Sequence, residues 1–168
     1  MSKIKLSLRS TREYGESRAL FIDRECLVEY DGDVCLREKD FKLLVEYLPK
    51  LKNLLKDYDY CLVVAHLPQV AKGWLNHKEL EKMDQKIIDD SQKNELQIDA
   101  VMNCIHSPDE DGIVALCIPC SCHPDRGGLF LQAAVKYNLS LSRSAYVSYK
   151  DLKINKSLGL DFLNFNDL

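Results

Sequence analysis

Short apolar runs alternate with more polar segments along the chain. Residues 19–22 and 60–65 are apolar and end abruptly at polar residues, as buried strands of a parallel sheet do. Residues 98–104 and 145–148 have the same character, and residues 162–165 form a shorter apolar run. We therefore predict that these runs are strands of a parallel sheet.

Helical periodicity fills the intervals between the predicted strands. Residues 41–56, 76–92 and 129–137 repeat apolar side chains every three or four positions, and Asn76 is placed to cap the second helix. Alternating strands and helices predict right-handed crossovers and an α/β fold of three layers, with helices on both faces of the sheet. Ligands of such sheets bind beyond the carboxyl ends of the strands. We expect Asp23, Ala65 and the residues after Ser148 to converge there.

Length and composition favour one globular domain. The chain has 168 residues, 46% of them hydrophobic, which is enough to bury a single core. We predict a polar leader over residues 1–17 and one domain over residues 18–168. No stretch is apolar enough for a membrane span or a signal peptide, so we expect a cytoplasmic protein.

The charge balance indicates what kind of partner the protein binds. The 23 basic and 26 acidic residues are interspersed and give a net charge of −3. This pattern provides no basic surface for nucleic acid and no polybasic patch for a membrane. We expect a small anionic ligand or a protein partner instead.

A metal-ligand pattern occupies the loop after the third predicted strand. Cys104 with His106 and Cys120 with Cys122 are two pairs, each with one intervening residue. Three thiolates and one imidazole suit tetrahedral zinc, and a site with four protein ligands is structural because no position is left for water. We predict a structural zinc ion that fixes the loop over residues 104–122.

Two alternatives to this ligand set exist in the same loop. Cys117 and Cys120 form a Cys-x-x-Cys pair, which defines a different register with Cys104 and His106, and His123 is a further candidate. The cysteines can also be ordinary reduced thiols. The chain has seven cysteines, and four of them lie within nineteen residues, which favours metal binding over disulfides.

Together, residues 21–25 (FIDRE), 62–65 (LVVA), 70–73 (VAKG) and the two ligand pairs resemble the haloacid dehalogenase (HAD) superfamily. The resemblance is to its zinc-containing D-glycero-D-manno-heptose 1,7-bisphosphate phosphatases and their histidinol-phosphate phosphatase relatives, over roughly residues 18–165. It implies a HAD-like, Rossmann-like three-layer sandwich. It also implies phosphate ester hydrolysis with magnesium.

The resemblance assigns catalytic roles near the first strand, where the family has Asp-x-Asp-Gly-Thr. The matching residues make Asp23 the nucleophile and put Glu25 at the acid/base position. The extra methylene of Glu25 displaces the carboxyl group, and Cys26 replaces a glycine of the exit turn. The first motif is therefore only partly retained.

The phosphate-binding motif after the second strand is also altered. The family has Thr-Asn-Gln-Ser-Gly, whereas this chain has Ala65 at the first position and Pro68 in place of the serine, so two hydroxyl groups are lost. His66 is the remaining side chain that we expect to contact phosphate. Lys72 matches a basic position of the family loop and is a candidate to bind an anionic ligand.

The last two family motifs supply a lysine and a magnesium ligand. The family's Arg-Lys pair is replaced by His123 and Pro124, so Arg126 is the nearest candidate for the missing charge. Lys150 stands at the position of a magnesium ligand and is expected to pair with Asp23. A one-residue slip offers the alternative that Asp151 and Asp23 hold magnesium.

These departures favour a pseudophosphatase, because phosphoryl transfer depends on positioning and on positive charge around the phosphate. The alternative is an active magnesium-dependent sugar-phosphate phosphatase with Asp23 as nucleophile. A third hypothesis is a structural subunit that pairs with an active paralogue or with a sugar-nucleotide pathway enzyme. Trp74 either fills the core or covers the crevice.

Overall fold

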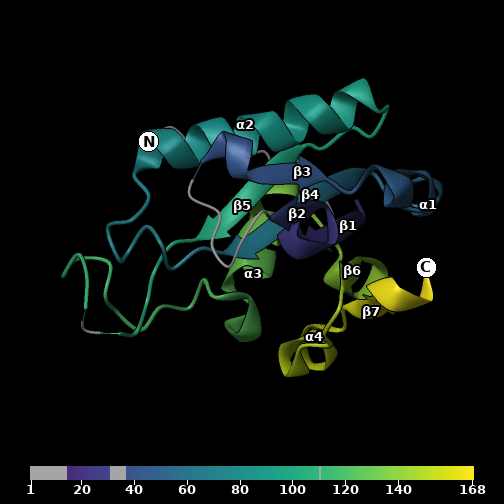
Figure 1. The fold of residues 1–168 in the computed structure, drawn as a ribbon. Coiled ribbons are helices and arrows are strands. Elements are labelled where there is room, and N and C mark those ends of the chain that lie inside the picture. Colours follow the sequence, from purple (N-terminus) through teal and green to yellow (C-terminus); the bar gives the residue numbers. More distant parts are fainter. Residues whose placement is uncertain (1–14, 31–36, 110) are drawn as a thin grey trace, which may run out of the picture.

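A parallel sheet forms the centre of the molecule. The computed structural model describes residues 15–30, 37–109 and 111–168. Its main sheet has five parallel strands in the order β5-β4-β1-β6-β7 (Figure 1). The strands are β1 (Ala19–Asp23), β4 (Tyr60–His66), β5 (Ala100–Cys104), β6 (Ala145–Ser148) and β7 (Asp161–Asn164). The predicted parallel sheet is confirmed.

Helices cover both faces of this sheet (Figure 1). On one face, α1 (Leu48–Leu55) and α2 (His77–Lys93) pack against the side chains of Leu20 and Ile22. Phe21 points to the other face, where α3 (Gly128–Tyr137) and α4 (Lys153–Leu158) lie. Because successive residues of a strand alternate between faces, β1 contributes to both cores. The predicted α/β fold of three layers is confirmed.

A hairpin beside the sheet corrects one predicted helix. β2 (Val28–Tyr30) pairs antiparallel with β3 (Phe41–Leu43), so the predicted helix over residues 41–56 is wrong in its first half. Phe41 is buried in the hairpin and is 3% exposed. Pro49 explains where the helix begins, since proline is tolerated in the first turn of a helix and not in its interior.

The helix α2 begins at the residue that the sequence predicted. Asn76 Oδ1 accepts a hydrogen bond from Glu79 N at 3.0 Å, and Glu79 Oε2 accepts one from Asn76 N at 2.8 Å, which completes a capping box. Within the described ranges, no helix is both long and apolar enough to cross a membrane. Short 3-10 helices lie at Arg24–Cys26, Glu38–Asp40, Val45–Tyr47, Pro124–Arg126, Leu141–Arg143 and Phe165–Asp167.

Candidate ligand cavity and metal cluster

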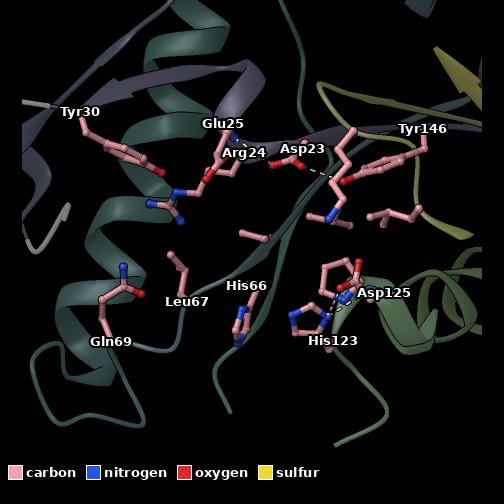
Figure 2. Close-up of a pocket in the computed structure, with 15 residues that line it drawn as sticks. Asp23, Arg24, Glu25, Tyr30, His66, Leu67, Gln69, His123, Asp125 and Tyr146 are labelled. Atoms are coloured by element: carbon pink, nitrogen blue, oxygen red, sulfur yellow. Dashed lines mark hydrogen bonds and ion pairs between the residues drawn. The ribbon is translucent and has the colours of Figure 1, made fainter. Parts of the chain in front are cut away.

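A cavity of about 450 Å³ lies at the carboxyl ends of β1, β4 and β6. Asp23, Ala65 and Lys150 line it, so the residues that were expected to converge do so. Figure 2 shows Asp23 and Tyr146 on one side of the cavity and His66 and His123 on another. The location is the usual one for a ligand of an α/β sheet.

Neutral hydroxyl groups hold the Asp23 carboxylate. The hydroxyls of Tyr146 and Ser148 donate to Oδ2 at 2.8 and 2.9 Å, and the backbone N–H of Glu25 donates to Oδ1 at 3.1 Å. Burial, and next the charge of Asp23, raise the pKa of Tyr146, so this phenol stays protonated and remains a donor. Both oxygens of Asp23 are therefore engaged by the protein.

The predicted ion pair between Asp23 and Lys150 is wrong. Lys150 lines the same cavity, but its ammonium group comes within 4.0 Å of no carboxylate among the described residues. Phe21 of β1 is paired with Tyr146 of the neighbouring strand β6. This register places the side chains of Tyr146 and Ser148 within hydrogen-bonding distance of Asp23. The hydroxyls occupy the place that the prediction gave to the lysine.

Glu25 borders the cavity next to Asp23. Although the residue is exposed overall, partial burial of its carboxyl group and then the negative charge of Asp23 raise its pKa. Glu25 therefore takes up a proton more readily than an isolated glutamate. This property suits a proton donor.

Four metal-ligand side chains meet at the carboxyl end of β5. The Sγ atom of Cys104 lies 3.1 Å from that of Cys122, 3.5 Å from that of Cys120 and 3.9 Å from His106 Nδ1, and all four atoms lie within 4.8 Å of one another. With zinc–sulfur bonds of about 2.3 Å, ligand atoms around a tetrahedral ion are separated by roughly 3.5–3.8 Å. The donor set and its spacing fit a zinc ion.

The alternative ligands lie outside this cluster. Cys117 Sγ is close to Gly112, and His123 Nδ1 accepts a hydrogen bond from Asp125 N at 3.1 Å. Burial raises the pKa of Cys104 and favours its thiol form, whereas a bound metal ion would favour the thiolate. The structure thus groups the four residues that were predicted, and leaves out Cys117 and His123.

The segment that directly follows the cluster, residues 123–125, forms part of the wall of the ligand cavity. His66 Nε2 lies 2.8 Å from the backbone carbonyl of His106, and because a carbonyl only accepts, Nε2 carries the proton. A second cavity of about 280 Å³ shares His66 and His123 with the first and is also lined by Arg126. Arg126 donates a hydrogen bond to the carbonyl of Cys120. Ordering the metal loop therefore shapes both cavities.

Comparisons with known proteins show which proteins this chain resembles in sequence and in fold. No protein-family model matches the chain. Over 138 residues, the chain is 25% identical to the D-glycero-beta-D-manno-heptose-1,7-bisphosphate 7-phosphatases of two Helicobacter pylori strains, and the match covers 80% of this chain and 74% of each relative.

Solved structures agree in fold. A protein of Mesorhizobium loti described as a HAD-like phosphatase has a TM-score of 0.75 at 23% identity, over 87% of this chain and 70% of that one. The D,D-heptose 1,7-bisphosphate phosphatase of B. bronchiseptica, solved with magnesium and phosphate, has a TM-score of 0.68 at 17% identity, over 86% and 78% of the two chains. The chain has a HAD-like phosphatase fold. Its resemblance to heptose bisphosphate phosphatases is confirmed.

Of the two residues predicted to hold magnesium, Asp23 lines the ligand cavity and Asp151 does not. Asp151 is exposed, its Oδ1 accepts a hydrogen bond from Asn155 Nδ2 at 3.1 Å, and it does not line the cavity with Asp23. Magnesium requires oxygen ligands in octahedral order, with at least one or two carboxylates free to coordinate. The cavity therefore does not bring together the predicted magnesium pair of Asp23 and Asp151.

Lys72 and Trp74 interact with each other outside the cavity. Lys72 Nζ lies 5.1 Å from the centre of the Trp74 ring and 3.9 Å from Asp109 Oδ2. Neither side chain lines the two cavities, and Trp74 is 55% exposed. Trp74 therefore neither fills the core nor lines the crevice.

Sequence reasoning missed the hydroxyl partners of Asp23 and the role of Arg24. Arg24 is buried, and its Nη1 donates to Asp84 Oδ1 at 2.9 Å. A signal for Tyr146 and Ser148 was present in the sequence, since both lie on the same face of a strand that ends at the crevice. This signal identifies partners of Asp23 only when β6 is known to lie next to β1.

Proposed function

We propose that the protein is a phosphatase-like protein that has lost most or all phosphoryl-transfer activity. In this proposal it acts by binding a small anionic ligand or a protein partner. The engagement of Asp23 is the observation that carries it. A nucleophilic carboxylate needs a lone pair directed at phosphorus, but Oδ2 already accepts two hydroxyl hydrogen bonds.

Other residues of the cavity support the same proposal. Ala65 offers no side-chain hydrogen bond to a phosphate, and Pro124 offers neither a charge nor an N–H. Lys150 stands where the family resemblance expects a magnesium ligand. Losing a metal and a correctly placed lysine removes several orders of magnitude in the rate of phosphoryl transfer.

The metal cluster has a structural role in this proposal. Cys104, His106, Cys120 and Cys122 would hold one zinc ion that fixes the wall of the cavity and leaves no open coordination position. All six cysteines of the described ranges are free thiols. Free thiols are typical of reducing compartments, and the proposal includes a cytoplasmic location.

An activity assay tests the proposal directly. Purified protein is incubated in magnesium with D-glycero-D-manno-heptose 1,7-bisphosphate, histidinol phosphate and an aryl phosphate, beside the variant Asp23→Asn. We expect the two proteins to release phosphate at the same background rate. Turnover by the wild type that Asp23→Asn abolishes would contradict the proposal.

The second candidate is an active phosphatase of altered design, which the raised pKa of Glu25 favours. Here Asp23 would attack phosphorus, Glu25 would protonate the leaving group and Arg126 would supply positive charge. The same assay decides between the two candidates, because this design requires Asp23. A third role, as a structural subunit beside an active paralogue, predicts copurification with that paralogue.

A further inference from the structure

Arg24 has one edge of its guanidinium group in use and one edge free. The residue is 1% exposed, and Nη1 pairs with Asp84 Oδ1 at 2.9 Å. The other two nitrogens, Nε and Nη2, are buried and have no hydrogen-bond partner. Their N–H groups lie on the same edge and point in the same direction, which is the geometry that binds two oxygens of one anion.

The free edge belongs to a residue of the cavity wall and is itself buried. Arg24 lines the cavity, and Figure 2 shows its guanidinium turned away from Asp23, toward the side where Tyr30, Leu67 and Gln69 lie. Gln69 also lines this side, and its Oε1 is a buried acceptor with no hydrogen-bond partner. Two unpaired donors and one unpaired acceptor thus border the same space.

Asp84 holds this arrangement in place. Its Oδ1 accepts from Arg24, and its Oδ2 accepts from Asn103 Nδ2 at 2.6 Å, so the carboxylate is tied to both β5 and the loop after β1. A positioned carboxylate on one side of a guanidinium fixes the plane of the opposite edge. Arg24 is therefore oriented before any ligand arrives.

We propose that Arg24 and Gln69 form an oxyanion-binding corner of the cavity. The Nε and Nη2 groups of Arg24 donate to two oxygens of a carboxylate or phosphate, and Gln69 Oε1 accepts from a neighbouring hydroxyl group of the same ligand. The ligand class is a small hydroxylated acid or phosphate ester. This inference rests on the proposed function, since it says where in the cavity the anionic ligand binds.

Three considerations support this corner over other parts of the cavity. Buried donors without partners are costly, so a bound oxyanion recovers free energy that the free protein forgoes. Asp23 and Glu25 repel an anion placed next to them, and the Arg24 guanidinium points away from Asp23. Lys150 lines the same cavity and adds positive charge.

Binding of two simple probes tests the corner. The wild-type protein is titrated with inorganic phosphate and separately with acetate, by calorimetry and by the NMR signal of the Arg24 side-chain Nε–H. We expect the Nε–H signal to shift as the probe saturates, because that hydrogen gains an acceptor. Comparing the two probes distinguishes a phosphate ligand from a carboxylate ligand.

Two variants test the residues, and one serves as a control. Arg24→Lys keeps the charge but removes the two-donor edge, and Gln69→Glu places a carboxylate beside that edge. We expect each to weaken probe binding by about tenfold or more, the loss of one charge-assisted hydrogen bond. Gln132→Glu makes the same chemical change on the exposed side of α3 and should leave binding unchanged. Thermal denaturation checks that each variant folds.

The outcomes separate this inference from the proposed function. If the wild type binds a probe and both folded variants bind it equally well, the corner is wrong while anion binding by the cavity stands. If the wild type binds neither probe, the corner and the anionic-ligand proposal both fail. An Nε–H signal that does not move while calorimetry reports binding also overturns the corner.

Discussion

The Asp23 carboxylate is surrounded by neutral hydrogen-bond donors. Its two oxygens accept hydrogen bonds from Tyr146, Ser148 and the backbone of Glu25. Hydroxyl donors neutralise no charge, so they stabilise the carboxylate without the counter-ion that phosphoryl transfer requires. At the scale of single residues, these three hydrogen bonds fix the position of the Asp23 carboxylate.

The raised pKa of Glu25 predicts that the stability of the protein depends on pH. Its folded-state pKa is raised, so between its unfolded and folded values it binds more protons in the folded state. Its contribution to the free energy of unfolding therefore falls as pH rises through that window. The variant Glu25→Gln, which does not titrate, should gain stability relative to the wild type between about pH 4 and about pH 7.

Urea denaturation at both pH values measures this difference. The matched control is Glu29→Gln, which alters an exposed glutamate on β2. Because Glu25 is itself exposed, solvent screens the effect, and its direction is the informative result. The same difference between Glu25→Gln and wild type at both pH values would contradict the assigned pKa shift.

The sequence predicted the metal ligands better than it predicted the surroundings of Asp23. Ligand pairs such as Cys120 and Cys122 are local, so their spacing carries the chemistry whatever the fold around them. The partners of Asp23 come from β6, more than one hundred residues away. Which strand lies beside β1 is a property of the whole sheet and is not visible in the local pattern.

At the scale of elements, the metal loop joins β5 to α3. Gly128 begins α3, and an added Cβ there would lie 2.0 Å from the carbonyl oxygen of Ser121. Only glycine permits this close approach of the helix to the segment between Cys120 and Cys122. The cluster thus joins the start of the loop to a point near its end, and the close approach at Gly128 packs that end against α3.

Cysteine variants test which thiols hold the metal. Protein purified without chelator should contain about one zinc per chain in the wild type and in Cys117→Ser, and less than about half in Cys122→Ser. Elemental analysis measures the metal, and thermal denaturation should show a lower transition for Cys122→Ser alone. Zinc loss in Cys117→Ser, with zinc retained in Cys122→Ser, would favour the register that includes Cys117.

The hairpin of β2 and β3 shows why some elements were predicted from the sequence and others were not. Long periodic segments such as α2 (His77–Lys93) were found, because their pattern extends over several turns. β2 and β3 each have three residues, which is too short for a period to appear. α4 (Lys153–Leu158) is also short, and it packs through tertiary contacts rather than through a pattern of its own.

At the scale of the whole molecule, the sheet still brings its strand ends together as a phosphatase does. Asp23, Ala65 and Lys150 border one cavity, and the metal loop closes its side. The architecture depends on strand order and core packing, which none of the altered motif residues disturbs. The fold alone therefore does not report whether this cavity is catalytic.

Introducing the family groups tests whether their absence explains the proposed inactivity. The substitutions Glu25→Asp, Ala65→Thr, Pro124→Lys and Lys150→Asp return the acid, a hydroxyl, the lysine and the magnesium ligand to the family pattern. Because these groups act jointly on one phosphoryl group, we expect the fourfold variant to hydrolyse an aryl phosphate at least about 100-fold faster than the wild type in magnesium. Each single variant should stay within a few-fold of the wild type, since the other groups are still missing.

The control is the fourfold variant with Asp23→Asn, which should return to background because the nucleophile is gone. Steady-state rates with magnesium and with chelator measure the gain, and thermal denaturation confirms folding. A folded but inactive fourfold variant would move the cause to the hydroxyls of Tyr146 and Ser148, which would still engage the Asp23 carboxylate. Turnover produced by one substitution alone would instead mean that the absence of a single group, and not of all four together, prevents catalysis.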